Sequence, residues 1–380
     1  MRKVYLDNAA TTPVFDEVIE SMATSMRENF GNPSSTHQYG RTAKSLIETC
    51  RKNIAHNLNV NSSEIIFTSG GTEANNLILR NAVLNLGVEK IITSKLEHHA
   101  VLKTVNELHI DYGVEVVYVE ESNAGVVDIV SLRSVLGTGD KKTLVSLMFV
   151  NNEIGTILEI KKIASICKEY NAFFHSDSVQ AVGHFDIDLS DLNVDFISAS
   201  AHKFHGPKGI GFAYFKKGFG VKPMIFGGEQ EKGARAGTEA VHSILGMDIA
   251  LKTCLQSLQN DLQQLLDMKR YCVDLIKSDI PDVKFNAGSD NLETTTVTIL
   301  NIKLPIEVPF LMFNLDLKGI AVSGGSACQS GSNRGSHVLE ALLTPAEAAH
   351  TSLRLSFSKF TSKEDINYFV ATLKELLSKK

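Results

Sequence analysis

At 380 residues the chain exceeds the usual size of one domain, so we expect a large domain and a smaller one. Its 43% hydrophobic and 21% charged residues are typical of a soluble globular protein and argue against a disordered chain. A formal net charge of −5 gives no electrostatic signature of nucleic-acid binding, and no apolar run reaches the length of a membrane span.

The N-terminus reaches Asp7 before any apolar run that a signal peptide needs, which predicts a cytoplasmic protein. Five cysteines without a Cys-x-x-Cys pair argue against a disulfide framework or a zinc site. Four of them lie in segments with a helical period and are interpreted as small buried hydrophobic residues: Cys50, Cys167, Cys254 and Cys272.

Helical periods and short apolar runs alternate along the first two thirds of the chain. Residues 1–15 look like a turn-like lead-in, and helices are expected over 16–28 and 43–58. Strands are expected over 64–69, 90–94, 114–119, 143–150, 172–176 and 194–198, most of them separated by helical segments. This alternation predicts an α/β fold with a mainly parallel sheet and helices on both faces.

A helical period then continues from 239 to 280, long enough to cross from one domain to the next. The remainder predicts strands near 295–300 and 352–357 and helices near 309–317 and 363–377, as in a smaller α+β domain. We therefore expect a large domain over 16–255 and a small domain made of 1–15 and 256–380.

Lys203 follows the predicted strand 194–198 and precedes a turn rich in Gly and Pro at 206–211. Open α/β sheets bind their ligands just past strand ends. A buried lysine amine becomes a nucleophile that forms a Schiff base with a carbonyl substrate or with pyridoxal phosphate. The alternative is an ordinary solvated lysine.

Two other strand ends carry suitable chemistry. Residues 67–75, Phe-Thr-Ser-Gly-Gly-Thr-Glu-Ala-Asn, join a strand to a helix and suit a phosphate cradle, although the motif alone is more typical of an ordinary tight turn. Asp177 ends the strand 172–176 and would keep a pyridine nitrogen protonated, unless it only caps the next helix.

Three further side chains are candidates. His98, at a junction between strand and helix, suits stacking on a flat cofactor or acid–base work, against a capping or surface role. Arg354 alternates with Leu353 and Leu355 and would grip a carboxylate by two hydrogen bonds, unless it lies on a solvated sheet face. Cys328, in a glycine-rich run, suits an accessible nucleophilic thiol or an unreactive loop cysteine.

As a set, these stretches resemble the cysteine desulfurases of the first class, the nitrogen-fixation and iron–sulfur cluster type. Those proteins are pyridoxal-phosphate enzymes of the aspartate-aminotransferase fold type. The resemblance runs from Tyr5 to Arg354. The motifs that carry it are Thr68-Ser-Gly-Gly-Thr-Glu73, Glu97-His98, Val150-Asn-Asn-Glu-Ile-Gly155, His175-Ser-Asp-Ser-Val-Gln180, Ser200-Ala-His-Lys203, Arg235-Ala-Gly-Thr238 and Ser326-Ala-Cys328.

The resemblance implies a role for each site residue. Lys203 would bind pyridoxal phosphate covalently, Asp177 would hold its pyridine nitrogen and His98 would stack on its ring. Cys328 would attack the sulfur of bound L-cysteine. The other implied contacts are Asn152 and Gln180 to the ring oxygen or substrate, Arg354 with Asn152 to the substrate carboxylate, and Gly71, Thr72, Ser200 and His202 to the phosphate, joined by Thr238 of a second subunit.

The implied activity is conversion of L-cysteine to L-alanine with the sulfur held as a persulfide on Cys328. The implied partners are a second copy of the chain and a sulfur-acceptor protein, without direct nucleic-acid or membrane binding. Three alternatives stay open at this stage: a selenocysteine lyase or cysteine-sulfinate desulfinase on the same scaffold, a pyridoxal-phosphate aminotransferase, and a non-catalytic binding protein in sulfur traffic.

Overall fold

The computed structural model describes residues 2–324 and 335–378. Its largest sheet has seven strands in the order β2-β8-β7-β6-β5-β3-β4. Strands β3 to β7 pair in parallel, and β8 is antiparallel to both β7 and β2. The strands are β2 (Ile65–Thr68), β3 (Lys90–Thr93), β4 (Glu115–Tyr118), β5 (Thr143–Ser146), β6 (Phe173–Asp177), β7 (Phe196–Ser200) and β8 (Gly211–Phe215).

Successive strand residues enter two different cores, which places helices on both faces of this sheet. Ile92, Val145 and Ile197 pack with α2 (Gln38–Asn57), α6 (Ile160–Glu169) and the first half of α8 (Val241–Asp279). Their neighbours Ile91 and Leu144 pack with α3 (Gly71–Leu84) and α4 (His99–Tyr112). Because side chains alternate along a strand, this division confirms the predicted helices on both faces of the sheet. The remaining helices of this part are α1 (Asp16–Glu28), α5 (Ile129–Leu136) and α7 (Leu189–Leu192).

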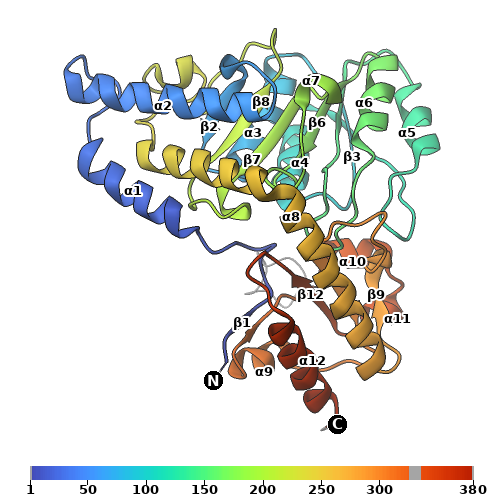
Figure 1. Ribbon diagram of the computed structural model, residues 1–380. Coiled ribbons are helices and arrows are strands. Elements are labelled where there is room, and N and C mark those ends of the chain that lie inside the picture. The colour runs from blue at the N-terminus through green and yellow to red at the C-terminus, as the bar shows by residue number, and fades with distance from the viewer. Residues whose placement is uncertain (1, 325–334, 379–380) are drawn as a thin grey trace.

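Helix α8 has 39 residues and links the large sheet layer to a second, smaller body (Figure 1). Its residues up to Leu251 and Cys254 lie in the first core, whereas Leu265 to Ile276 lie in a separate core of the smaller body. Because α8 passes from one core to the other, we propose a large domain over 16–255 and a small domain made of 1–15 and 256–380.

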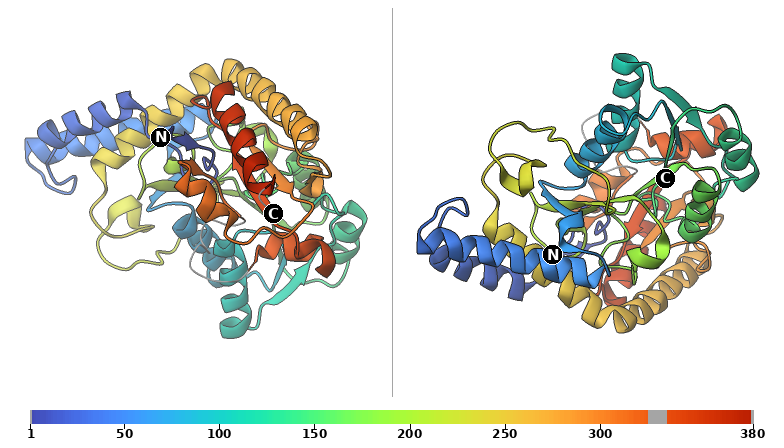
Figure 2. Two further views of the ribbon diagram at one scale, coloured as in Figure 1. Left: turned by 90° about the horizontal axis from the view of Figure 1, so that it is seen from below. Right: turned by 90° about the horizontal axis from the view of Figure 1, so that it is seen from above.

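The smaller body contains both described chain ends (Figure 1). Seen from below, α12 lies beside the second half of α8 (Figure 2). The central strand of the smaller body, β10, pairs antiparallel with β12 and β9. Strand β1 pairs in parallel with β11. The elements are β1 (Val4–Tyr5), β9 (Lys284–Phe285), β10 (Ile299–Lys303), β11 (Ile320–Ala321), β12 (Ser352–Ser356), α9 (Leu311–Leu317), α10 (His337–Leu342), α11 (Pro345–Ala348) and α12 (Lys363–Ser378).

Three features of the structure differ from the sequence expectations. Residues 1–15 are not only a lead-in, because Val4 and Leu6 are buried and β1 forms part of a sheet through a partner more than 300 residues away. The strand expected near 295–300 lies instead at 299–303, since the backbone N–H of Thr295 bonds within a turn to Asn291 and that of Thr296 bonds to the distant Gly155. Strand β8 was not expected, because it directly continues a run rich in Gly and Pro.

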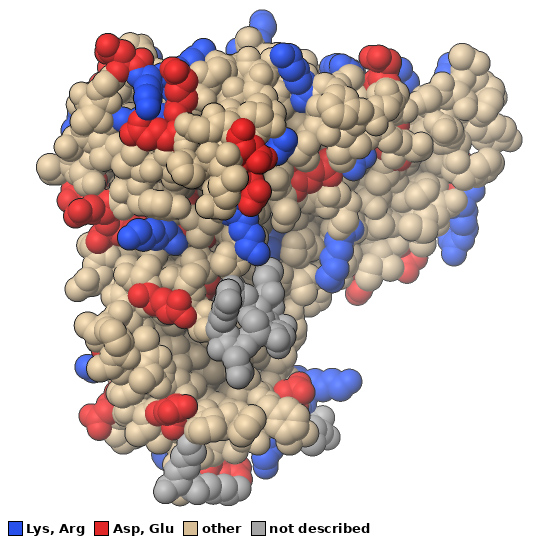
Figure 3. All heavy atoms as spheres, turned by 180° about the vertical axis from the view of Figure 1, so that it is seen from behind, with Lys and Arg blue, Asp and Glu red and all other residues tan. Residues whose placement is uncertain are grey.

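The described residues contain no helix that is both long and apolar enough to cross a membrane. On the face seen in Figure 3, lysines and arginines alternate with acidic residues over the surface. The four cysteines expected in helices are all buried, and burial raises the pKa of each thiol.

Candidate active site

A cavity of about 530 Å³ lies at the carboxyl edge of the large sheet. This volume falls in the range typical of small-molecule and cofactor sites. The structure brings ten of the predicted residues together around it: Gly71, Thr72, His98, Asn152, Asp177, Gln180, Ser200, His202, Lys203 and Arg354. Thr238 is exposed and does not line this cavity, and Cys328 lies outside the described residues.

Lys203 ends the short helix η2 (Ala201–Lys203) that directly follows β7. Its Nζ donates hydrogen bonds to the backbone oxygens of Ala9, at 2.6 Å, and Ala10, at 2.9 Å. The His184 ring Nε2 lies 2.9 Å from the Lys203 carbonyl oxygen. The lysine is therefore a half-buried amine held at the cavity wall, not a freely solvated side chain.

Asp177 is buried at the end of β6, and its two oxygens are held from different sides. Oδ2 accepts from Asn75 Nδ2 at 2.6 Å, and Oδ1 accepts from the backbone N–H of Val179 at 3.0 Å. Sequence reasoning missed Asn75, whose only signal is its place on α3 one turn after Gly71. These neutral donors orient the carboxylate without neutralising it.

His98 is the N-cap of α4, and its Nδ1 accepts a hydrogen bond from the backbone N–H of Ala100 at 3.1 Å. Burial lowers the pKa of His98, with opposing influence from Asp177 and a further lowering by Lys203. The ring is thus neutral with its proton on Nε2. This state leaves a flat aromatic surface at the cavity.

His202 and Gln180 connect the cavity wall to the N-terminal segment. His202 Nδ1 lies 3.2 Å from the hydroxyl of Thr11, and burial together with Lys203 and Lys208 lowers its pKa to about 4. Gln180 Nε2 donates to the carbonyl oxygen of Ala9 at 2.9 Å. No pattern in the sequence predicts that Ala9 and Thr11 contact these residues.

The turn from β2 into α3 forms a cradle of backbone N–H groups. Gly70 precedes the helix with φ of 149°, a conformation that favours glycine. A Cβ on Gly71 would lie 2.5 Å from Cγ2 of Val179. The missing side chains leave space at the positive end of a 14-residue helix, which fits a phosphate group.

Arg354 lies on β12 and is only 1% exposed, which excludes the solvated sheet face. Its Nη2 donates to Asp7 Oδ1 at 2.8 Å and its Nη1 to the backbone oxygen of Asn152 at 2.9 Å. Sequence reasoning did not identify Asp7 as its partner.

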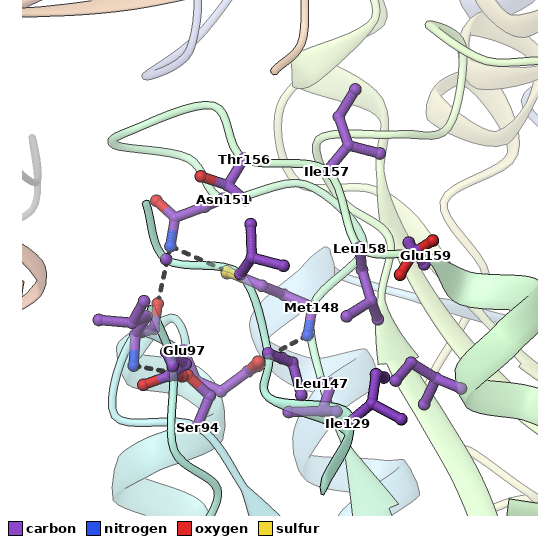
Figure 4. A pocket seen from close by; sticks show the side chains of 16 residues that line it. Ser94, Glu97, Ile129, Leu147, Met148, Asn151, Thr156, Ile157, Leu158 and Glu159 are labelled. Carbon is purple, nitrogen blue, oxygen red and sulfur yellow. Dashed lines mark hydrogen bonds between the residues drawn. The ribbon is translucent and has the colours of Figure 1, made fainter. Parts of the chain in front are cut away.

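Glu97 is fully buried and lines a smaller cavity of about 40 Å³ (Figure 4). Its Oε1 accepts from the backbone N–H of Met148 at 2.6 Å. Burial raises the pKa of Glu97 well above its usual value, and the nearby carboxylates of Asp177 and Glu121 raise it further. Glu97 therefore joins the His98 turn to the segment after β5. Within the described residues, no cluster of three or more metal-binding side chains is found.

Comparisons with known proteins place the chain in a family. The aminotransferase class-V family model matches residues 4–369. A cysteine desulfurase IscS of Dictyoglomus turgidum is 42% identical over 381 residues, covering 100% of this chain and 95% of the relative. Among solved structures, a NifS-like protein has a TM-score of 0.91 and 35% identity, with 100% of both chains covered. The structure of SspA in complex with cysteine has a TM-score of 0.81 and 31% identity, covering 95% of this chain and 100% of that one.

The chain therefore belongs to the aminotransferase class-V family. Within it, the relatives and solved structures confirm the predicted resemblance to cysteine desulfurases of the IscS and NifS type.

Proposed function

We propose that this protein is a pyridoxal-phosphate-dependent cysteine desulfurase, which converts L-cysteine to L-alanine and transfers the sulfur to an acceptor. One observation carries the proposal: a single cavity brings together a lysine amine, an oriented carboxylate, a neutral histidine ring and a buried arginine. The 42% identity to a cysteine desulfurase over the whole chain supports the same activity.

The residues present fit pyridoxal phosphate. The cradle at Gly71 and Thr72 offers backbone N–H groups and room for the phosphate, and Lys203 offers the amine for covalent attachment. Asp177 retains lone pairs for a pyridine N–H, and the neutral His98 ring offers a stacking surface. When bound, pyridoxal phosphate supplies an electron sink that makes the α-hydrogen of an amino acid acidic.

The other groups bind the substrate and move its proton. Arg354, with Asn152 beside it, binds the α-carboxylate of L-cysteine by charge-assisted hydrogen bonds. The Lys203 amine would accept the α-proton of the bound substrate. The carbonyl oxygens of Ala9 and Ala10 hold that amine close to the cavity.

The sulfur leaves through Cys328, which lies outside the described residues. Its thiolate attacks the substrate sulfur; a sulfur–sulfur bond forms and the carbon–sulfur bond breaks with its electrons left on carbon. L-Alanine is complete once that carbon takes up a proton and the α-carbon regains the proton that Lys203 accepted. The persulfide then passes to the thiol of an acceptor protein. One of the solved relatives was determined in complex with cysteine, which supports cysteine as substrate here.

The direct test measures alanine released from L-cysteine in the presence of a reducing thiol. We expect stoichiometric alanine and sulfide from the wild type and none from Lys203→Ala. Borohydride reduction followed by peptide mapping should place the cofactor on Lys203. Lys208, which also lines the cavity, is the matched control; a label on Lys208 would contradict the assignment.

The same assay separates the alternatives. Preferred turnover of selenocysteine or cysteine sulfinate, or amino transfer to a keto acid without any need for Cys328, would replace the proposed activity. A purified protein that takes up no pyridoxal phosphate would instead be a non-catalytic binding protein.

A further inference from the structure

The segment Asp7–Ala10 contacts several groups of the candidate active site. The carbonyl oxygens of Ala9 and Ala10 accept from Lys203 Nζ, and that of Ala9 also accepts from Gln180. The side chain of Asp7 contacts Arg354. The proposed catalytic amine and the proposed carboxylate-binding guanidinium are thus set by the same four residues, none of which has an assigned role so far.

Asp7 is the acidic side chain that forms an ion pair with Arg354 in the described part of the chain. A buried guanidinium needs such a partner, because removal of a charge from water costs several kcal/mol when it is left unpaired. Glu153 is the other nearby carboxyl group. The Glu153 carboxyl group accepts a hydrogen bond from the Ser336 hydroxyl. Burial raises the pKa of Glu153, although Ser336, His337 and Arg354 each act to lower it.

The Asp7 carboxylate is itself held in place. Its Oδ1 also accepts from the hydroxyl of Ser323 at 2.8 Å, and Ser323 exchanges backbone hydrogen bonds with Arg354 at 2.7 and 3.3 Å. The Asp7 backbone bridges to Ser356 on the same strand as Arg354. The ion pair therefore has a fixed geometry.

This arrangement leaves part of the guanidinium for a ligand. An arginine has five N–H donors, of which Asp7 takes one on Nη2 and the Asn152 carbonyl takes one on Nη1. Nε is buried and has no hydrogen-bond partner among the described residues. Three donors remain, which suffice for two parallel bonds to a carboxylate.

We propose that Asp7 is a positioning residue that fixes the Arg354 guanidinium for the α-carboxylate of the substrate. It thereby selects amino acids over amines that lack this carboxylate. The inference rests on the proposed function and adds a determinant of substrate specificity to it.

The test compares L-cysteine with cysteamine, which has the same amine and thiol but no carboxylate. Binding of each to the holoenzyme is titrated by the change in the cofactor's visible absorbance. In Asp7→Ala we expect the Kd and KM for L-cysteine to rise about 10-fold to 100-fold, the range for loss of one hydrogen bond to a charged group. The Kd for cysteamine should stay within about 2-fold, and kcat should change much less than KM.

Two variants keep the test decisive if Asp7→Ala folds poorly. Asp7→Asn retains an oxygen acceptor without the charge and should give an intermediate Kd for L-cysteine. In an Arg354→Lys background, Asp7→Ala should add little, because both changes act on one interaction. Asp365→Ala is the matched control, since it breaks an aspartate–arginine pair with Arg2 at the same 2.8 Å on the surface.

Equal weakening of L-cysteine and cysteamine would make Asp7 merely structural and overturn the proposal. An unchanged or lowered Kd for L-cysteine in Asp7→Ala would also overturn it, since Asp7 would then be irrelevant or a competitor for the guanidinium. Failure of the proposed function is a separate result, because the wild type would then produce no alanine from L-cysteine.

Discussion

His205 shows how a single side chain ties the N-terminal segment to the turn that follows Lys203. It is 3% exposed, its ring stacks on Phe15 with centroids 4.4 Å apart, and its Nδ1 donates to the Pro13 carbonyl oxygen at 2.8 Å. Burial lowers its pKa to about 4, with smaller influences from Pro13, His184, Lys359 and Asp261. The folded protein thus keeps this ring neutral where the unfolded chain, with a pKa near 6.5, protonates it.

This difference predicts a pH-dependent effect of His205→Asn. Asparagine tolerates the φ of 64° at this position but does not titrate in this range. Between about pH 6.5 and pH 4 the unfolded wild type binds more protons than the folded state, so its stability falls as the pH falls. His205→Asn should be less stable at pH 7, and the deficit should shrink by roughly 1 to 3 kcal/mol at pH 4. Urea unfolding at both pH values measures this, and a constant deficit would contradict it.

At the same scale, the sequence predicted the residues that carry recognisable chemistry in recognisable motifs. Lys203, Asp177, His98 and Arg354 all line one cavity as expected. It did not predict Asp7 or Asn75 as their partners, because the contact between Asp7 and Arg354 joins residues 347 positions apart and that between Asn75 and Asp177 joins residues 102 apart. A single sequence carries no signal of such a pairing.

Among the elements, the turn from β2 into α3 has little spare room at Gly71. Gly71→Ala should weaken binding of pyridoxal phosphate by about 10-fold, because its Cβ would collide with Cγ2 of Val179 and shift the cradle. Equilibrium dialysis of the cofactor measures this change.

The matched control removes the methyl group of Val179 with which the new Cβ would collide. Val179→Ala in the Gly71→Ala background should restore most of the affinity, since the colliding methyl group is then absent. If Gly71→Ala retained the cofactor as well as the wild type, the proposed phosphate cradle would be wrong.

The elements that the sequence predicted best are those with a strong local pattern. The helices at 16–28 and 363–377 and the strands of the parallel sheet were expected within a few residues of their observed bounds. The two-residue strands β1 and β11 have no local pattern, because they exist only through pairing with each other. Strand β8 starts at Gly211, where a Cβ would lie 2.2 Å from the Ala199 carbonyl oxygen. The glycine is therefore needed for close packing of the strands, although in the sequence it suggests a turn.

At the scale of the whole molecule, Thr238 of a single chain does not line the proposed site, where the family resemblance places a Thr238. Thr238 is exposed, and nearby Arg235 forms an ion pair with Glu73 on α3 of the same chain at 2.9 Å. Phe226 is 85% exposed and Phe30 is 65% exposed, which is unusual for large apolar side chains on a monomer surface. We propose that a second copy of the chain covers these residues and that Thr238 of each copy serves the phosphate site of the other.

A mixing experiment tests this shared site. Lys203→Ala subunits lack the catalytic amine, and Thr238→Ala subunits should bind the cofactor poorly when it is limiting. In a mixed dimer with crossed sites, one site carries both changes, but the other combines an intact Lys203 with the intact Thr238 of the partner subunit. Mixing the two variants under conditions of subunit exchange should therefore restore alanine production at one of the two sites. If Thr238 serves its own chain, neither site of the mixed dimer is intact, so activity no higher than the sum of the separate variants would refute the shared site, as would full activity of a monomer in light scattering.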